Sequence, residues 1–283
     1  MWHTQTAAVT GSGHRSKQLP CQDKTWCLEA NGVTAIALAD GAGSAALSQE
    51  GAEIAVRMIC RTLCERFDEL YAAKSPVEMR VLALQGIRER IRSHAMAREA
   101  SVSSFACTLL AVAVRGNDYL LIHVGDGVIG YQKNGRVLVA SGPQNGEYAN
   151  TTSFVTSRDV YRTAHVLRGV QPELEGFLLM SDGCEAALYQ KQRASIAPLA
   201  KRLFQRAELL DQHAAEALLQ EVLERFIALH TRDDCSLAVM ARERTSWDRL
   251  TQREKAAVLG IGTQKKSRRR RMILKYAKLL GAA

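Results

Sequence analysis

The sequence predicts an α+β fold built on antiparallel β-strands. Short apolar runs are joined by the turn signals Gly-Asn-Asp and Lys-Asn-Gly, which are typical of β-hairpins. Long stretches with apolar residues at helical spacing follow one another in pairs. A parallel sheet would instead alternate single strands with single helices, so this order favours antiparallel pairing.

The N-terminal half is expected to contain three strands followed by two long helices. Residues 7–11, 25–29 and 33–40 are rich in β-branched or small apolar side chains. Residues 48–71 and 77–100 carry the helical periodicity, and Pro76 stands at the start of the second helix, where proline is tolerated.

The second half begins with a block rich in strands. We expect strands at 105–114 and 119–127, a hairpin of 128–132 with 136–140, and a polar, glycine-containing loop over 141–153. A further strand at 176–183 ends in Asp-Gly. Helices at about 196–206 and 212–230 and a strand at 235–241 close this part of the chain.

The excess positive charge is confined to the C-terminal end. The chain has 283 residues, with 38 Lys and Arg against 29 Asp and Glu. Residues 243–283 hold 12 of these basic residues and 3 of the acidic ones, which leaves 26 of each in residues 1–242. We therefore predict a neutral folded domain over 1–242 and a basic extension over 243–283, helical or partly disordered. Specific nucleic-acid binding is not expected of a neutral domain.

Cysteine usage predicts a reducing compartment. The seven cysteines are an odd number without a Cys-x-x-Cys pair, which argues against a disulfide framework or a zinc finger. The first residues lack the apolar region of a signal peptide, and no run of 18 apolar residues is present. We therefore expect a cytoplasmic protein.

Aspartate recurs at the ends of the apolar strands. Any one of these residues could serve turn chemistry alone, because Asp-Gly is a favoured turn pair. Several carboxylates at strand ends repel one another unless a cation lies among them, and oxygen ligands without histidine suit Mg²⁺ or Mn²⁺. The residues concerned are Asp23, Asp40, Asp126, Asp182, Asp233 and Asp234.

Seven segments, taken in order, resemble the metal-dependent protein serine/threonine phosphatases of type 2C, in particular their compact bacterial branch. The segments are GHRSKQLPCQDK, ADGAGSA, SSFACTLLAV, VGDG, GEYAN, SDG and RDDCSLAV, spread over about residues 5–242. The resemblance implies a sandwich of two antiparallel sheets with helices outside. It also implies a binuclear Mg²⁺ or Mn²⁺ centre at one edge, with a looser site for a third ion, that activates water to hydrolyse phosphoserine and phosphothreonine.

The resemblance also implies individual roles. Asp40 would bridge two metals, and the Gly41 carbonyl would complete one coordination sphere. Asp182 and Asp233 would bind the other metal, while Asp126 would share a third ion with Asp182. Asp23 would hold water beside the metals or bind one directly. No cysteine would be needed as a nucleophile.

The chain departs from the family pattern at several positions. Ala42 replaces a histidine that is a candidate acid for the leaving alcohol, and Gln22 replaces a glutamate. Asp234 stands where asparagine is usual, and Gln18 occupies the place of the arginine that binds substrate phosphate. His14 and Arg15, slightly upstream, are the natural substitutes for that arginine. These changes keep an alternative open, a pseudophosphatase that acts as a phosphoprotein-binding or kinase-binding scaffold.

The basic extension has several possible roles. Six basic residues fall within seven positions at 265–271, and a short amphipathic segment follows. Such a stretch can lie on an anionic membrane surface, bind an acidic partner, contact nucleic acid nonspecifically or remain solvated. Since phosphatases of the bacterial branch often act opposite a cognate serine/threonine kinase, the resemblance adds a kinase to the candidate partners, beside phosphorylated proteins.

Overall fold

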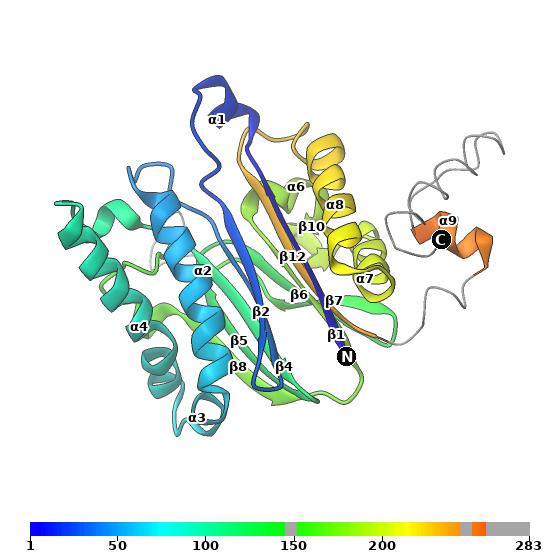
Figure 1. Ribbon diagram of the computed structural model, residues 1–283, viewed down its shortest axis with the longest axis horizontal. Helices are drawn as coiled ribbons and strands as arrows, with labels where there is room; N and C mark the ends of the chain where they lie inside the picture. The colour runs from blue at the N-terminus through cyan, green and yellow to red at the C-terminus, as the bar shows by residue number, and fades with distance from the viewer. Residues whose placement is uncertain (145–151, 244–250, 259–283) are drawn as a thin grey trace.

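The chain forms four layers, with helices on both outer faces of two stacked β-sheets (Figure 1). The computed structural model describes residues 1–144, 152–243 and 251–258. All strand pairs in both sheets are antiparallel, which confirms the predicted α+β sandwich.

The first sheet has the strand order β2-β3-β4-β5-β8. Its middle strands consist of apolar residues that are buried on both faces, because one face packs on helices and the other on the second sheet. The strands are β2 (Lys24–Ala30), β3 (Val33–Ala39), β4 (Leu109–Arg115), β5 (Asp118–Val124) and β8 (His165–Val170).

The second sheet has the order β1-β12-β9-β6-β7. It joins the first strand of the chain to the last one of the sandwich, since β1 pairs with β12 along its whole length. The strands are β1 (Trp2–Val9), β12 (Cys235–Arg242), β9 (Leu174–Met180), β6 (Val128–Lys133) and β7 (Arg136–Ser141).

Strand β3 shows how the layers are held together. Ala35 and Ala37 face the helical layer, where small side chains let the helices approach closely. Ile36 and Leu38 point the other way, into the core between the sheets. Alternation along a strand thus supplies two separate cores, and fully buried aliphatic side chains of this size contribute about 1.5–3 kcal/mol each.

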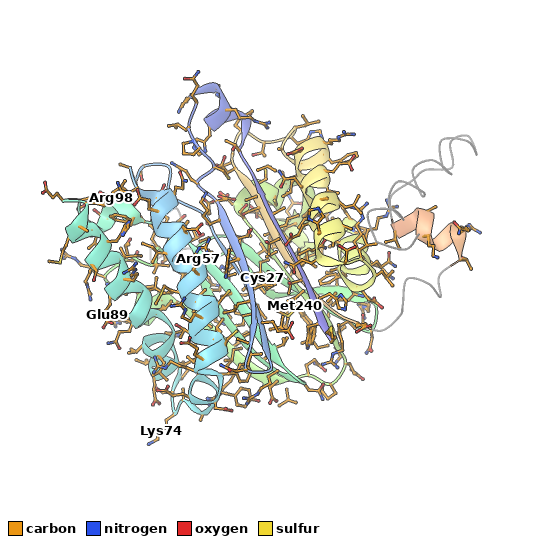
Figure 2. All side chains as sticks on the ribbon, viewed as in Figure 1. Cys27, Arg57, Lys74, Glu89, Arg98 and Met240 are labelled. Carbon is orange, nitrogen blue, oxygen red and sulfur yellow. The ribbon has the colours of Figure 1, made fainter. Side chains whose placement is uncertain are left out.

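Three helices cover the first sheet, namely α2 (Ser48–Glu65), α3 (Phe67–Ala72) and α4 (Pro76–Ala97). The single helix predicted over 48–71 is therefore wrong in one respect, because the chain breaks between α2 and α3 at Arg66. Arg57 of α2, labelled in Figure 2, holds its guanidinium carbon 3.8 Å from the ring centre of Trp26 on β2. Ser75 caps α4 by accepting a hydrogen bond from the Glu78 backbone N–H.

The second sheet is covered by α7 (Leu199–Leu209) and α8 (Gln212–Val222). The predicted helix over 212–230 is α-helical only to Val222 and continues as a π-helical turn, Leu223–Ile227. The short elements lie between the main ones. They are α1 (Ser12–Ser16), η1 (Val102–Phe105), α5 (Val160–Thr163), η2 (Asp182–Cys184), α6 (Glu185–Leu188), η3 (Lys191–Arg193) and α9 (Gln252–Val258).

Three strands were not anticipated from the sequence. Strand β8 has a mixed burial pattern at the edge of its sheet, and so lacks a clean apolar run. The two-residue strands β10 (Tyr189–Gln190) and β11 (Ser195–Ile196) form a small hairpin of their own. The strand expected to begin at 105 begins at Leu109, because residues 102–105 form the 3₁₀ turn η1 instead.

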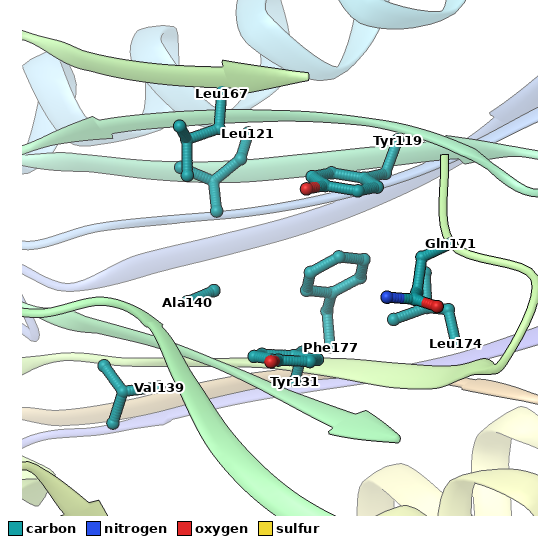
Figure 3. A pocket seen from close by; sticks show the side chains of 9 residues that line it. All are labelled: Tyr119, Leu121, Tyr131, Val139, Ala140, Leu167, Gln171, Leu174 and Phe177. Carbon is teal, nitrogen blue, oxygen red and sulfur yellow. The ribbon is translucent and has the colours of Figure 1, made fainter. Parts of the chain in front are cut away.

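A cavity of about 230 Å³ lies between the two sheets (Figure 3). Aromatic side chains of both sheets meet there, with the rings of Tyr119 and Phe177 centred 5.7 Å apart. The nine lining residues are Tyr119, Leu121, Tyr131, Val139, Ala140, Leu167, Gln171, Leu174 and Phe177.

The structure describes only part of the predicted basic extension. Helix α9 is attached to α7, since buried Arg206 donates a hydrogen bond from Nε to the Val258 carbonyl (2.8 Å). Residues 244–250 and 259–283, with the basic cluster, lie outside the described residues. The boundary at 242 therefore remains a prediction. None of the helices within the described ranges has the length and hydropathy of a membrane-spanning segment.

The contact between α2 and η1 generates a prediction with a built-in control. A Cβ atom on Gly51 would lie 2.1 Å from the Phe105 carbonyl oxygen, whereas one on Gly86 of α4 would meet only the Met58 Cε atom at 3.7 Å. Alanine favours helix by about 1 kcal/mol at both sites. We expect Gly86→Ala to stabilise the protein by about 0.5–1 kcal/mol. Gly51→Ala should destabilise it by about 1–3 kcal/mol, because overlap with backbone outweighs propensity. Urea unfolding measures both, and stabilisation by Gly51→Ala would contradict this packing.

Buried His123 generates a prediction about pH. Its Nδ1 lies 2.7 Å from Ser141 Oγ, and Ser141 Oγ lies 2.9 Å from His165 Nδ1. Burial, followed by the charge of His165, lowers the pKa of His123 to about 3. Between about pH 6.5 and 3 the unfolded chain therefore binds a proton that the folded chain excludes. The free energy of unfolding should fall on acidification, by up to about 1.4 kcal/mol per pH unit from this group.

The measurement is urea unfolding of the wild type and of His123→Asn at several pH values in one buffer series. The difference between the two pH slopes isolates His123, because all other groups are shared. We expect a shallower slope for the variant, and equal slopes would contradict the exclusion of the proton.

Candidate metal centre

One cavity at the edge of the sandwich gathers most of the predicted site residues. It has a volume of about 190 Å³. Its walls come from α1, from the ends of β3, β5 and β9 and from the start of β12, which are far apart in the sequence. The lining residues are His14, Gln22, Asp40, Gly41, Ala42, Gly43, Thr108, Asp126, Thr152, Phe154, Asp182 and Asp233.

Asp40 is held in place through its backbone. Its N–H donates to Thr108 Oγ1 (2.9 Å), and its carbonyl accepts a hydrogen bond from the Thr108 N–H (2.8 Å). Gly41 then bridges to Cys107, and a Cβ atom on Gly41 would lie 2.9 Å from the Ser48 side chain. The glycine is therefore required by packing against Ser48.

The other carboxylates enter from neighbouring strand ends. Asp182 directly follows Ser181 at the end of β9, and Asp233 lies two residues before β12. Asp126 follows β5 and accepts a hydrogen bond from Thr152 Oγ1 (2.7 Å). The fold thus brings together the four aspartates predicted to bind metal.

Asp23 lies behind this cavity and is 1% exposed. Its Oδ2 accepts a hydrogen bond from Ser236 Oγ (2.6 Å), and Ser236 N–H donates in turn to Ser181 Oγ (3.0 Å). Sequence reasoning missed both serines. The available signal was their position, one residue before Asp182 and two after Asp234, each within a strand-end motif.

Burial and mutual repulsion make the aspartates hard to ionise. Burial raises the pKa of Asp23 to about 7, against the hydrogen bonds from Ser236 and Ser181, which lower it. The pKa of Asp40 lies well above its ordinary value, first through burial and then through the charges of Asp23 and Asp182. The pKa of Asp182 is raised by burial and by the charge of Asp233. A cation among these groups would relieve the repulsion.

The donor set fits a hard divalent cation. Asp23 Oδ1 and Asp182 Oδ1 are buried without a hydrogen-bond partner among the described residues. All the converging ligands are oxygens, which Mg²⁺ and Mn²⁺ prefer. Within the described ranges no group of three or more His, Cys, Asp or Glu side chains is arranged so that it could hold a metal ion. The fit to a hard cation therefore rests on the oxygen chemistry of the cavity, and water would supply the rest of the coordination, as Mg²⁺ usually requires.

Asp234 links the N-terminal loop to this site. Its side chain is 2% exposed, and it accepts hydrogen bonds from the backbone N–H groups of Gly11 and Gln22, both at 2.6 Å. Asp234 Oδ2 also lies 2.9 Å from His14 Nδ1. One carboxylate thus fixes both ends of the loop and the side chain that projects from it.

The two predicted phosphate-binding residues are placed differently. His14 lines the cavity, whereas Arg15 is exposed and is not among the lining residues. The GEYAN segment, with Glu147, Tyr148 and Asn150, lies outside the described residues.

A wider hollow of about 710 Å³ adjoins the cavity and shares Asp182 with it. Its walls are mostly polar, and Lys191 Nζ lies 2.8 Å from Glu185 Oε2 on one side. Arg193, Tyr189 and Gln190 also line this hollow.

The cysteines near the site are buried, unreactive thiols. Burial raises the pKa of Cys107 and keeps the pKa of Cys184 well above its usual value, so both thiols stay protonated. All seven cysteines are free. Neither thiol has the exposed, thiolate-stabilising surroundings of a nucleophile.

Comparison with known proteins relates this geometry to a family. Residues 10–225 match the family described as Protein phosphatase 2C. Over 163 residues the chain is 31% identical to Serine/threonine-protein phosphatase 3 of Escherichia coli (strain K12). That match covers 56% of this chain and 64% of the relative, so the chain spans just under two thirds of the relative's length.

Solved structures share the fold. A bacterial serine phosphatase superposes with a TM-score of 0.59 at 15% identity, covering 87% of this chain and 100% of the other. The Mycobacterium tuberculosis serine/threonine phosphatase PstP/Ppp gives a TM-score of 0.57 at 13% identity, covering 86% and 99%. Since the family match spans most of the sandwich, from the loop before α1 to the π-helical turn before β12, the chain belongs to the protein phosphatase 2C family.

Proposed function

We propose that the protein is a metal-dependent phosphatase that hydrolyses phosphoserine and phosphothreonine in proteins. The observation that carries this proposal is the convergence of Asp40, Asp126, Asp182 and Asp233 on one open cavity. Family membership supports the same reaction class.

The proposed ligands are the cavity residues to which the family resemblance assigns metal binding. Asp40 would bridge two ions, with the Gly41 carbonyl on one of them and Asp182 and Asp233 on the other. Asp126 and Asp182 would hold a possible third ion. Bound Mg²⁺ or Mn²⁺ would lower the pKa of a water between the ions and neutralise charge on the phosphoryl oxygens.

The chain's own residues fix the geometry of the reaction. Asp23, which accepts a hydrogen bond from Ser236, would orient Asp40 and nearby water from behind the cavity. Thr108 fixes the backbone of Asp40, and a Cβ atom on Gly43 would meet nothing within 4 Å. This small-residue segment leaves room for a phosphorylated side chain to reach the carboxylates. Positioning of this kind can supply a large part of a rate enhancement.

The adjoining hollow suggests a protein substrate. A phosphate group alone needs only the smaller cavity, whereas a hollow of about 710 Å³ beside it can hold flanking polypeptide. Its wall offers both charges, Lys191 and Arg193 against Glu185. We propose that the segments flanking the phosphorylated residue lie there. Arg15 remains a proposed phosphate contact from the exposed loop.

Two observations favour the alternative, a pseudophosphatase that binds phosphoproteins or a kinase as a scaffold. Ala42 and Gln22 line the cavity without the side chains of the common family form. The retained aspartates weigh against this alternative, because a scaffold has no need for costly buried carboxylates.

The proposed location rests on the cysteines, and the proposed partners follow from the reaction. Seven free cysteines are consistent with a cytoplasmic protein, as predicted. Phosphorylated proteins are the proposed substrates, and a cognate serine/threonine kinase is a proposed partner. Contacts of the basic extension with an acidic partner or an anionic membrane surface remain predictions.

The carboxylate cluster predicts a metal-dependent activity. Wild-type protein with Mn²⁺ or Mg²⁺ should release phosphate from a phosphothreonine peptide, and EDTA should abolish the release. Asp182→Asn should lower kcat by at least about 100-fold, because it removes a proposed ligand. Asp68→Asn is the matched control, since Asp68 lies on α3 and pairs with Arg115 away from the cavity. A folded wild type that is inactive with every metal would support the scaffold alternative.

The same cluster predicts opposite effects of one substitution on stability. In metal-free protein at pH 7.5, Asp40→Asn should raise the melting temperature, because ionised Asp40 is disfavoured by burial, Asp23 and Asp182. Saturating Mn²⁺ should stabilise the wild type by about 2.7 kcal/mol at 100 times the dissociation constant, and the variant by much less. Differential scanning calorimetry with EDTA and with Mn²⁺ measures both. Equal Mn²⁺ shifts in the two proteins would rule out Asp40 as a ligand.

A further inference from the structure

The proposed reaction needs a proton donor at the cavity. Hydrolysis of a phosphoserine or phosphothreonine breaks the bond between phosphorus and an alkyl oxygen. An alkoxide is a poor leaving group, so a positioned acid that protonates this oxygen accelerates the step.

Few side chains on the cavity wall can give a proton. Ala42 and Gly43 carry no donor, and the aspartates are committed as metal-binding carboxylates. Thr152 Oγ1 already donates to Asp126. Of the described lining residues, His14 is the one with an imidazole ring, the side chain that most often transfers protons in catalysis.

Contacts with Asp234 and with the backbone of Arg232 hold His14 in position. Its Nδ1 lies 2.9 Å from Asp234 Oδ2, and Asp234 is itself buried and hydrogen-bonded by two backbone N–H groups. Gly13 N–H donates to the Arg232 carbonyl (2.8 Å), and a Cβ atom on Gly13 would lie 2.7 Å from that oxygen. The loop therefore sits directly on the segment that precedes β12.

The contact with Asp234 assigns the two ring nitrogens. Nδ1 is buried and lies 2.9 Å from this carboxylate oxygen, although outside the angles of a regular hydrogen bond. A hydrogen on Nδ1 is favoured there, because a bare nitrogen would set its lone pair against those of the carboxylate. Among the described residues neither ring nitrogen has a regular hydrogen-bond partner, and because Nδ1 faces Asp234, Nε2 is the nitrogen that can meet a ligand in the cavity.

We propose that His14 is the catalytic acid of this phosphatase and that Asp234 is its positioning residue. As water attacks phosphorus, the bond from phosphorus to the Ser or Thr oxygen breaks and its electron pair goes to that oxygen. Imidazolium Nε2–H gives its proton to the same oxygen, which yields the free hydroxyl group and inorganic phosphate. The proton that the attacking water loses to solvent balances the later reprotonation of His14. This inference rests on the proposed function.

The test compares two leaving groups. 4-Nitrophenolate leaves without a proton, whereas threonine needs one. His14→Gln should lower kcat on a phosphothreonine peptide by about 100-fold or more. The same variant should lose kcat on 4-nitrophenyl phosphate by a factor at least about ten times smaller. His213→Gln, the same change at an exposed position on α8, is the matched control, and thermal melting verifies that each variant is folded.

A second readout does not depend on activity. In metal-free protein, long-range ¹H–¹⁵N spectra should show His14 with a hydrogen on Nδ1, with its signals identified by their loss in His14→Gln. Asp234→Asn should change those signals and should lower peptide turnover more than 4-nitrophenyl phosphate turnover. A neutral His14 ring with its hydrogen on Nε2 alone would overturn the assignment.

The outcomes separate this inference from the proposed function. Equal losses on both substrates, with a raised KM, would mean that His14 binds phosphate, and would overturn the inference while leaving the phosphatase intact. A wild type that hydrolyses neither substrate with any metal would refute the proposed function, and the acid role with it.

Discussion

The carboxylate of Asp234 is the contact on which the site depends. It binds the backbone at both ends of the loop that leads from β1, in one sheet, to β2, in the other. The same carboxylate meets His14. Without it, the loop would lose the anchor that places His14 beside the aspartates. A buried carboxylate that accepts several hydrogen bonds is well satisfied, so this anchor can be stiff without an ion pair to a strong base.

Close approach of backbone segments is the second constraint. The chain before α1 passes so near the start of β12 that a Cβ atom on Gly11 would lie 2.1 Å from the Asp233 carbonyl oxygen. Gly183 is equally close to the Asp234 carbonyl. The segment of small residues after Asp40, at the end of a strand of the other sheet, also requires a glycine, because Gly41 packs against Ser48. Glycines thus permit close backbone approach at strand ends of each sheet, next to the carboxylates of the cavity.

The stability of the sandwich offsets the unfavourable electrostatic free energy of the clustered aspartates. Burial and repulsion raise the pKa values of Asp23, Asp40 and Asp182, so the site is electrostatically unfavourable in the folded chain. Three apolar cores, one between the sheets and one under each helical layer, offset that cost. Unfavourable carboxylates of this kind concentrate at functional sites, and they bind cations for the same electrostatic reason.

The sequence by itself determined the element order, the antiparallel pairing and the aspartates of the cavity, because hairpin turns, strand periodicity and Asp-Gly strand ends are local signals. It did not determine the break at Arg66, the edge strand β8 or the end of α8, since packing between distant elements decides them. Ser236 behind Asp23, and Asp234 as the partner of His14, also depended on tertiary structure. They lie more than 200 residues from their partners, and the pairing of β1 with β12, together with the packing of β2 on β12, brings those segments together.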